Sequence, residues 1–271
     1  MRAGRRFYRM VGESLSVVGL GTWAIRDYEK AFNVIVKGVK DYGVNVIDTA
    51  EMYGYGASER LVGRVIAEAG RDSVFVVTKL LPERFQSRET AVKAARRSME
   101  RLGVREADLV LIHWPSATTS IEEQVRNLEA IADAGLARFV GVSNFDAAEL
   151  REALEAARRY EIVADQIHYS PIARQAEAEL IPLAESVGVM VQAYRVIERG
   201  TIGSYASEEA ARRLGLTPVQ AAIAYVVART PVSLALVKTE SVGHLEEIVE
   251  ASRIALSAGL DVELLGRVFK R

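Results

Sequence analysis

The stretch Ser73-Val-Phe-Val-Val-Thr-Lys79 is a nearly unbroken apolar, β-branched run, as expected of a strand that is buried on both faces. Residues 88–102 predict a helix that ends at Gly103, and residues 107–113 form a second apolar run. Strands with this pattern belong to parallel sheets that lie under helices. The stretch therefore predicts one strand–helix–strand unit of an α/β fold.

The same alternation extends in both directions along the chain. It predicts an N-terminal β-hairpin within residues 7–23 and then eight strands, each followed by a helix. The expected strands are residues 17–21, 44–48, 73–79, 107–113, 138–142, 163–167, 189–194 and 232–238. The expected helices are residues 28–42, 58–69, 88–102, 121–134, 147–160, 177–187, 217–228 and 242–256.

One closed (β/α)8 TIM barrel is the simplest architecture for this pattern, with the hairpin before a parallel eight-stranded barrel. The length of 271 residues agrees, since such barrels have roughly 250 residues. No linker or charge block interrupts the pattern, so residues 1–271 are expected to form a single domain. A doubly wound open sheet is the alternative.

Composition excludes several classes of partner and chemistry. With 35 Lys and Arg against 36 Asp and Glu, nothing favours a nucleic-acid or acidic-membrane partner. The absence of cysteine excludes disulfides, thiolate nucleophiles and Cys-ligated metals, and it fits a cytoplasmic location. The basic start runs into Phe-Tyr-Arg-Met, so no signal peptide is expected. Arg229 and Pro231 interrupt the apolar residues 219–237, which predicts a helix, a turn and a strand rather than a membrane span.

Polar side chains stand where three neighbouring strands end. Asp48, Lys79 and His113 follow apolar runs, at separations of 79−48=31 and 113−79=34 residues, and Tyr53 comes shortly after Asp48. Each alone could be a solvated strand end or a packing residue. Because barrel active sites lie at the C-terminal ends of the strands, their occurrence together predicts a catalytic site.

The charges of these four residues indicate a type of chemistry. A free phenol has a pKa of about 10, and a nearby Lys79 ammonium should lower the pKa of Tyr53. Asp48 would hold Lys79, and His113 could donate a hydrogen bond to a carbonyl oxygen. Such a site protonates an oxygen that becomes negative. It implies no metal or nucleophile, and it needs an external electron source.

These residues sit in blocks that resemble the aldo-keto reductase family. The blocks are Gly19-Leu-Gly-Thr-Trp23, Asp48-Thr-Ala-x-x-Tyr53-Gly, Thr78-Lys79, Leu111-Ile-His-Trp-Pro115, Gly141-Val-Ser-Asn-Phe145, Gln166, Tyr169-Ser-Pro171 and the segment around Lys238. The resemblance extends nearly from end to end. It implies an NAD(P)H-dependent enzyme that reduces the carbonyl groups of small-molecule aldehydes and ketones to alcohols. A monomer or a homodimer is expected.

The resemblance also implies the roles of individual residues. Asp48, Tyr53, Lys79 and His113 would form the catalytic tetrad, with Tyr53 as the general acid. The cofactor-binding residues would be Gly21, Thr22, Trp23, Asp48, Ser143, Asn144, Gln166, Tyr194, Arg195, Lys238, Thr239, His244 and Glu247. Among them, Ser143, Asn144 and Gln166 would bind the carboxamide, and Tyr194 would stack on the nicotinamide rather than serve as a core aromatic. The substrate pocket would be lined by Trp23, Tyr53, His113 and Trp114.

The chain departs from the family pattern after Tyr194. Family members commonly continue with Ser-Pro-Leu-Gly at the pyrophosphate, where this chain has Arg195-Val-Ile-Glu-Arg199. One hypothesis is that Arg195 or Arg199 replaces those contacts with a guanidinium–phosphate pair. The alternative is that one of them only pairs with Glu198 at the surface.

Other departures concern the choice of cofactor and two polar residues. Lys238 and Thr239 occupy positions that meet the 2′-phosphate of NADP in the family, but His244 stands where an arginine is frequent. A weakened preference for NADPH is therefore expected, with NADH as a second cofactor. Asp165 replaces a common asparagine without a clear interpretation, and His168 is expected at the surface or behind the site.

Two alternative functions stay open at this level. The first is an NADPH-binding regulatory subunit on the same barrel, with little or no turnover, as in channel-associated relatives. The second is a barrel enzyme of another class, such as an isomerase that uses Lys79 as a Schiff base. The complete tetrad favours the reductase.

Overall fold

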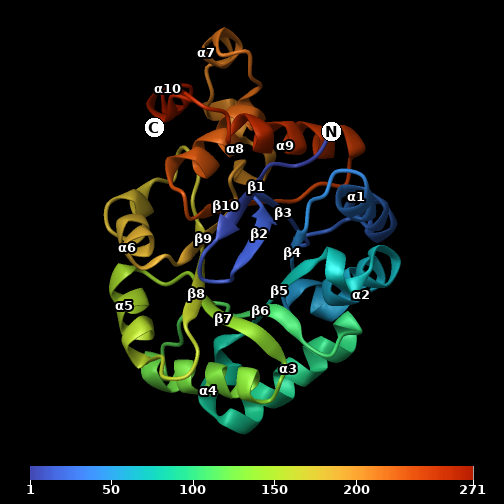
Figure 1. Cartoon of the computed structure of the whole chain (residues 1–271), viewed down its shortest axis with the longest axis vertical. Coiled ribbons are helices and arrows are strands. Elements are labelled where there is room, and N and C mark those ends of the chain that lie inside the picture. Colours follow the sequence, from blue (N-terminus) through green and yellow to red (C-terminus); the bar gives the residue numbers. More distant parts are fainter. Residues whose placement is uncertain (271) are drawn as a thin grey trace.

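Eight parallel strands close into a barrel in the computed structural model, which describes residues 1–270 (Figure 1). The strands are β3 (Val18–Gly21), β4 (Val46–Asp48), β5 (Phe75–Leu80), β6 (Ala107–Ile112), β7 (Ala137–Ser143), β8 (Ile162–His168), β9 (Met190–Tyr194) and β10 (Ser233–Val237). Each pairs with the next, and β10 closes the ring on β3 with Ala235 opposite Val18. The predicted TIM barrel is confirmed, and the open sheet is wrong.

Helices surround the barrel (Figure 1). They are α1 (Tyr28–Lys40), α2 (Ala57–Ala69), α3 (Arg88–Leu102), α4 (Ile121–Asp133), α5 (Ala147–Ala156), α6 (Leu180–Val187), α8 (Pro218–Arg229) and α9 (Val242–Ile254). The short helices α7 (Glu208–Arg213) and α10 (Val262–Gly266) were not predicted. Single 3₁₀ turns are η1 (Tyr53–Gly56), η2 (Arg71–Ser73), η3 (Pro82–Gln86), η4 (Gln175–Glu177), η5 (Glu198–Gly200) and η6 (Ile202–Tyr205).

Helices α5 and α6 differ most from their predicted ranges of residues 147–160 and 177–187. Helix α5 ends at Ala156 because Glu129, on α4, accepts hydrogen bonds from the backbone amides of residues 158–160 and draws them out of the helix. Helix α6 begins at Leu180, which places Pro182 in its first turn, where a missing N–H leaves no helical bond unmade. The end of α5 depends on a tertiary contact, and the start of α6 depends on the position of Pro182. The spacing of apolar residues predicts neither.

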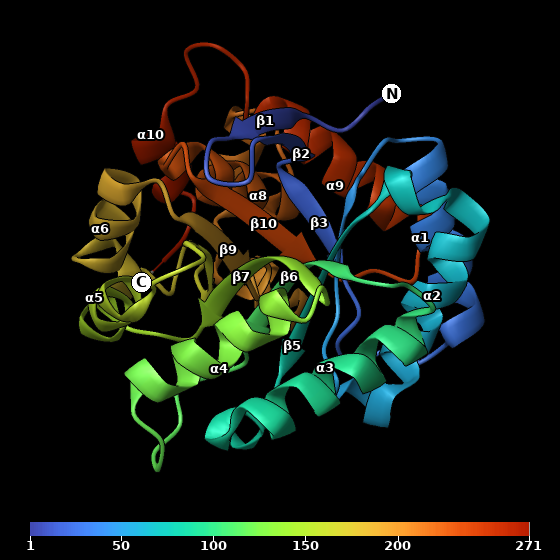
Figure 2. The same cartoon turned by 60° about the horizontal axis from the view of Figure 1, so that its bottom comes forward.

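The predicted hairpin, β1 (Arg5–Tyr8) and β2 (Glu13–Ser16), covers one end of the barrel (Figure 2). The Tyr8 hydroxyl donates to the Ser233 carbonyl at 2.7 Å, and the Ser16 amide donates to Asn45 Oδ1 at 2.7 Å. These partners lie where β10 and β4 begin. The hairpin therefore closes the N-terminal end of the strands and leaves the C-terminal end for function.

The barrel interior changes from apolar to polar along the strands. Inward-facing Val77, Leu111 and Met190 belong to an apolar cluster near the hairpin. Two residues further along the same strands come Lys79, His113 and Gln192, all buried. Because side chains alternate along a strand, these polar residues face the same interior one layer higher. No helix within residues 1–270 is long and apolar enough to cross a membrane.

Candidate active site

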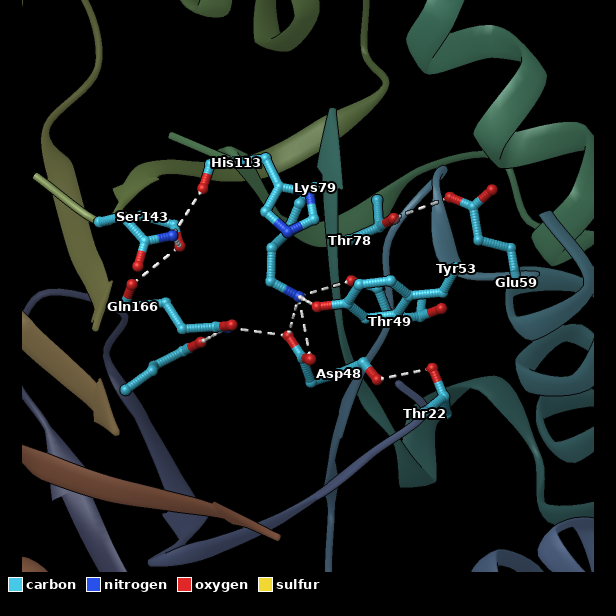
Figure 3. A network of polar contacts seen from close by, with 12 residues as sticks. Thr22, Asp48, Thr49, Tyr53, Glu59, Thr78, Lys79, His113, Ser143 and Gln166 are labelled. Carbon is cyan, nitrogen blue, oxygen red and sulfur yellow. Dashed lines mark hydrogen bonds and ion pairs between the residues drawn. The ribbon is translucent and has the colours of Figure 1, made fainter. Parts of the chain in front are cut away.

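Lys79 lies at the centre of a buried polar network (Figure 3). Its ammonium donates to both carboxylate oxygens of Asp48, at 2.7 and 2.9 Å, and to the Thr49 carbonyl at 2.8 Å. It also lies 3.2 Å from the Tyr53 hydroxyl. Because β4 and β5 are paired, their C-terminal ends bring Asp48 and Lys79 together, as the sequence predicted.

The turn after β4 places the Tyr53 ring above Lys79. The Glu51 amide donates to the Lys79 carbonyl at 3.0 Å, which fixes the turn to β5. The backbone then takes a left-handed conformation at residues 54–56, with φ of 54°, 52° and 84°. A side chain at Gly54 would come within 2.4 Å of the Tyr28 hydroxyl, so this position needs a glycine for space as well as conformation.

Burial has the largest effect on the pKa of both Lys79 and Tyr53. Burial opposes the charge on Lys79, but Asp48 and Tyr53 together raise its pKa above the ordinary value, so the ammonium stays charged. Burial raises the pKa of Tyr53, and Lys79 lowers it by less. Lys79 lowers the pKa of Tyr53, as expected. The expected net lowering is wrong, because a phenolate in this site loses its hydration.

His113 directly follows β6 and lies beside Tyr53. Their ring centroids are 5.7 Å apart in an edge-to-face arrangement, and the Trp114 ring centroid lies 4.7 Å from that of His113. Burial and the nearby Lys79 charge lower the pKa of His113 to about 3. The imidazole is therefore neutral at pH 7. Its Nδ1 atom is buried and has no hydrogen-bond partner within residues 1–270.

Gln166 extends the network across the barrel. Its amide group donates to Asp48 Oδ1 at 2.8 Å and to Gln192 Oε1 at 3.0 Å. The Ser143 hydroxyl donates to the Gln166 carbonyl at 2.8 Å. Gln192 was missed in the sequence, although it stands two residues before Tyr194 on the same strand. The alternation of side chains could have identified it as facing the same interior.

Asn144 and Tyr194 meet at the mouth of the barrel. The Tyr194 hydroxyl donates to Asn144 Oδ1 at 2.6 Å, and Asn144 Nδ2 donates to the His113 carbonyl at 2.9 Å. Asn144 has a φ of 60°, a conformation that asparagine tolerates better than most residues. One more ring, that of His168, lies nearly parallel to Tyr194, with centroids 5.7 Å apart.

The loop after β3 supplies Gly21, Thr22 and Trp23. Gly21 pairs with Asp48 across the two strands. The Thr22 side chain is buried, and its hydroxyl donates to the Asp48 carbonyl at 3.0 Å, so it supports the site from behind. Trp23, by contrast, is 45% exposed, and the Arg199 guanidinium lies 4.9 Å from its ring centroid. This contact joins the loops after β3 and β9.

Glu198, in the loop after β9, pairs with neither neighbouring arginine among the ion pairs of residues 1–270. It binds His168 Nε2 at 2.9 Å and accepts a hydrogen bond from Ser170 at 2.5 Å. The suggested surface pair between Glu198 and Arg195 or Arg199 is therefore wrong. The Arg195 guanidinium lies 5.9 Å from the Tyr194 ring centroid. His168, expected to be peripheral, anchors this loop to the end of β8.

A second group of predicted residues lies after β10, apart from the Lys79 network. Lys238 forms an ion pair with Glu240 at 2.7 Å, and Thr239 is buried beside it. Ser241 caps α9, whose first turn contains the exposed His244. Glu247, one turn later, accepts a hydrogen bond from Thr217 at 2.6 Å. Glu240 was not predicted as a site residue, although it stands two residues from Lys238.

The chemistry of the Lys79 network is proton transfer supported by fixed charge. It combines a protonated phenol, a charged ammonium and a neutral imidazole around one opening of the barrel. No group of three or more histidine or acidic side chains within residues 1–270 could hold a metal ion. The arrangement suits the protonation of an oxygen that gains negative charge.

Comparison with known proteins identifies a family and its members. The model of the Aldo/keto reductase family matches residues 17–259. Methylglyoxal reductase YeaE of Escherichia coli is 28% identical over 90% of this chain and 88% of that protein. An NADH-specific methylglyoxal reductase of E. coli is 32% identical over 70% of this chain and 66% of that protein. A probable voltage-gated potassium channel subunit beta of rice (Oryza sativa subsp. japonica) is 30% identical, and the match covers 73% of this chain and 66% of that protein.

Solved structures share the same barrel. The thermostable aldo-keto reductase Tm1743, in complex with the inhibitor epalrestat, is 31% identical with a TM-score of 0.85, covering 97% of this chain and 98% of that one. An aldo/keto reductase from Klebsiella pneumoniae, in complex with NADP and acetate, is 27% identical with a TM-score of 0.87, covering 99% of this chain and 96% of that one.

Proposed function

The chain belongs to the aldo/keto reductase family, and we propose that it is an NADPH-dependent reductase that converts aldehyde and ketone carbonyls to alcohols. The observation that carries this proposal is the buried Lys79 ammonium, which lies 2.7 Å from Asp48 and 3.2 Å from the Tyr53 hydroxyl. The proposal treats residues 1–271 as one catalytic domain. The expected cytoplasmic location and the monomeric or dimeric state stay predictions.

The mouth of the barrel fits a nicotinamide cofactor. The half-buried Tyr194 ring offers a face for stacking, and Ser143, Asn144 and Gln166 bring amide and hydroxyl groups to one side of it. Buried Gln192 Nε2 has no partner within residues 1–270, so the polar layer retains an unused donor. When bound, the reduced nicotinamide supplies a hydride to the carbonyl carbon. Lys238 and Thr239 would hold the 2′-phosphate.

Tyr53 donates the proton in this mechanism. Burial raises the pKa of Tyr53, so its hydroxyl keeps its proton at neutral pH and can give it to the carbonyl oxygen. The phenolate that remains lies beside the Lys79 ammonium, which stabilises its charge. Asp48 holds that ammonium in place with both carboxylate oxygens.

His113 orients the carbonyl. A pKa lowered to about 3 keeps the imidazole neutral, and a neutral ring carries one N–H donor. We assign that proton to Nε2, because Nδ1 is buried without a partner. The Nε2–H group of His113 and the Tyr53 hydroxyl would then both donate hydrogen bonds to the carbonyl oxygen of the substrate. Trp23 and Trp114 would form flat walls of the substrate pocket.

The test is Tyr53→Phe, which removes the proton and leaves the ring. Turnover of methylglyoxal with NADPH should fall by roughly 10² to 10⁴, the usual contribution of a general acid. NADP⁺ affinity, followed by Trp fluorescence, should be retained because the proposed cofactor contacts lie elsewhere. Equal turnover in variant and parent would refute the mechanism. Tyr55→Phe is the control, because Tyr55 is 98% exposed two residues away.

The second candidate is a regulatory subunit that binds NADPH with little turnover. The likeness to the rice channel subunit favours it. A panel of aldehydes, ketones and sugars separates the two functions. Steady cofactor consumption with at least one carbonyl supports the reductase, and tight NADPH binding without turnover on the whole panel supports the subunit.

A further inference from the structure

Glu240 occupies the place where the proposed site would meet the 2′ end of the cofactor. Its carboxylate lies 2.7 Å from the Lys238 ammonium. The same ammonium donates to the Ala24 carbonyl at 3.3 Å, so two of its three N–H groups already have partners. The cation assigned to the phosphate is thus largely engaged within the protein.

The carboxylate of Glu240 is also fixed in position. Oε1 accepts a hydrogen bond from the Arg26 amide at 3.1 Å, and Oε2 accepts one from the Asp27 amide at 3.0 Å. The side chain is only 17% exposed. Two successive backbone amides of the loop after β3 therefore hold the Glu240 carboxylate beside Lys238.

Glu240 is charged at neutral pH. Burial alone would raise the pKa of Glu240, but Lys238 and the amides of Arg26 and Asp27 lower it below its ordinary value. The pair with Lys238 is consequently neutral overall. A phosphate placed at Lys238 meets one positive and one negative charge at similar distances, so most of the attraction is cancelled.

A ribose hydroxyl would interact differently with the same carboxylate. A carboxylate can accept about four hydrogen bonds, and Glu240 accepts two from backbone amides and forms one ion pair with Lys238. One acceptor site is left for a donor. A 2′-hydroxyl is such a donor and a 2′-phosphate is not, and acidic residues bind the ribose hydroxyl of NAD in other dinucleotide sites.

We propose that Glu240 is a specificity-determining residue that lowers the discrimination between NADPH and NADH by neutralising Lys238 and accepting the 2′-hydroxyl of NADH. The inference rests on the proposed function, because that function assigns Lys238 to the cofactor. Exposed His244, in the first turn of α9, stands where the family frequently has an arginine.

The test measures the dissociation constants of NADP⁺ and NAD⁺ by titration calorimetry for the parent and for Glu240→Gln. Removing one charge beside a partly exposed lysine should tighten NADP⁺ by about 5- to 30-fold. NAD⁺ should weaken by about 2- to 5-fold as it loses a charged acceptor. Glu246→Gln is the matched control, since Glu246 is an exposed residue of α9 that binds Tyr42. It should change neither constant by more than about twofold.

A second variant keeps the test decisive if Glu240→Gln does not fold. In Lys238→Met, Glu240 stands without its cation, so NADP⁺ should bind more weakly than NAD⁺. Equal affinity for the two nucleotides in Lys238→Met, or an unchanged affinity ratio in folded Glu240→Gln, would overturn the inference while leaving the proposed function intact. A parent protein that binds neither nucleotide would overturn both.

Discussion

Two lysine–carboxylate pairs in this protein have the same N–O distance and opposite surroundings. Lys79 and Asp48 lie 2.7 Å apart with side chains that are 0% and 6% exposed. Lys238 and Glu240 also lie 2.7 Å apart, but their side chains are 33% and 17% exposed. Distance alone would make them equivalent. Because charges interact more strongly away from water, the attraction within the buried pair is strong, whereas partial exposure weakens the attraction within the second pair.

The surroundings also decide what each pair can do. Thr49 and Gln166 complete the hydrogen bonds of the inner pair, so its charges are held in one geometry. That geometry suits catalysis, since it needs no reorganisation when charge develops on Tyr53. The outer pair is partly exposed, at the place proposed for the 2′ end of the cofactor, where the amides of Arg26 and Asp27 hold its carboxylate. It therefore suits selection between ligands that differ by one charge.

The largest effect should follow from Lys79→Met. This change leaves Asp48 buried without its cation, and breaking a buried pair in this way costs about 3–5 kcal/mol. The free energy of unfolding, measured with urea, should fall by that amount. Combining Lys79→Met with Asp48→Asn should restore part of the loss, because no unpaired charge remains. A double variant as unstable as Lys79→Met would contradict this account.

An intermediate effect on stability is expected at Asp165, a buried carboxylate with no ion-pair partner within residues 1–270. Neither of its oxygens has a hydrogen-bond partner within residues 1–270. Burial raises the pKa of Asp165 well above its ordinary value, and the nearby Phe145 amide lowers it by less. The folded protein therefore binds a proton that the unfolded chain releases, so Asp165 reduces stability increasingly as pH rises from about 4.

Asp165→Asn removes this pH-dependent penalty. The variant should gain about 1–3 kcal/mol at pH 8, the penalty of an unsatisfied buried group, and less at pH 4. Urea unfolding at both pH values is the measurement. Glu152→Gln is the control, because Glu152 is exposed. Asp146→Asn is unsuitable, because Asp146 caps α5. An equal gain at the two pH values would show that Asp165 is not the titrating group.

The smallest effect should follow from Lys238→Met on stability. Exposed ion pairs contribute roughly 0–1 kcal/mol, so the free energy of unfolding should stay within that range of the parent value. The comparison with Lys79→Met then gives the effect of burial at equal N–O distance. A loss at Lys238 as large as that at Lys79 would remove the distinction between the two pairs.

Much of the site could be predicted because strand ends carry it. Asp48, Lys79 and His113 follow apolar runs, and pairing of neighbouring strands brings the ends of such runs together. Gln192 and Glu240 were missed for different reasons. Gln192 could have been predicted from the alternation of side chains along β9, which places it on the same face as Tyr194. The role of Glu240 depends on the amides of Arg26 and Asp27, which are more than 200 positions away in the chain.

The sequence by itself determined the barrel, the hairpin, and Lys79 with the three residues around it. The sequence signals for these features are local, because the apolar run of each strand and the polar residue after it are adjacent in the chain. Only the tertiary structure decided that burial raises the pKa of Tyr53 despite Lys79, and that Lys238 is paired while Asp165 is not. Hydration and partner distance depend on residues far apart in sequence, and folding alone brings these together.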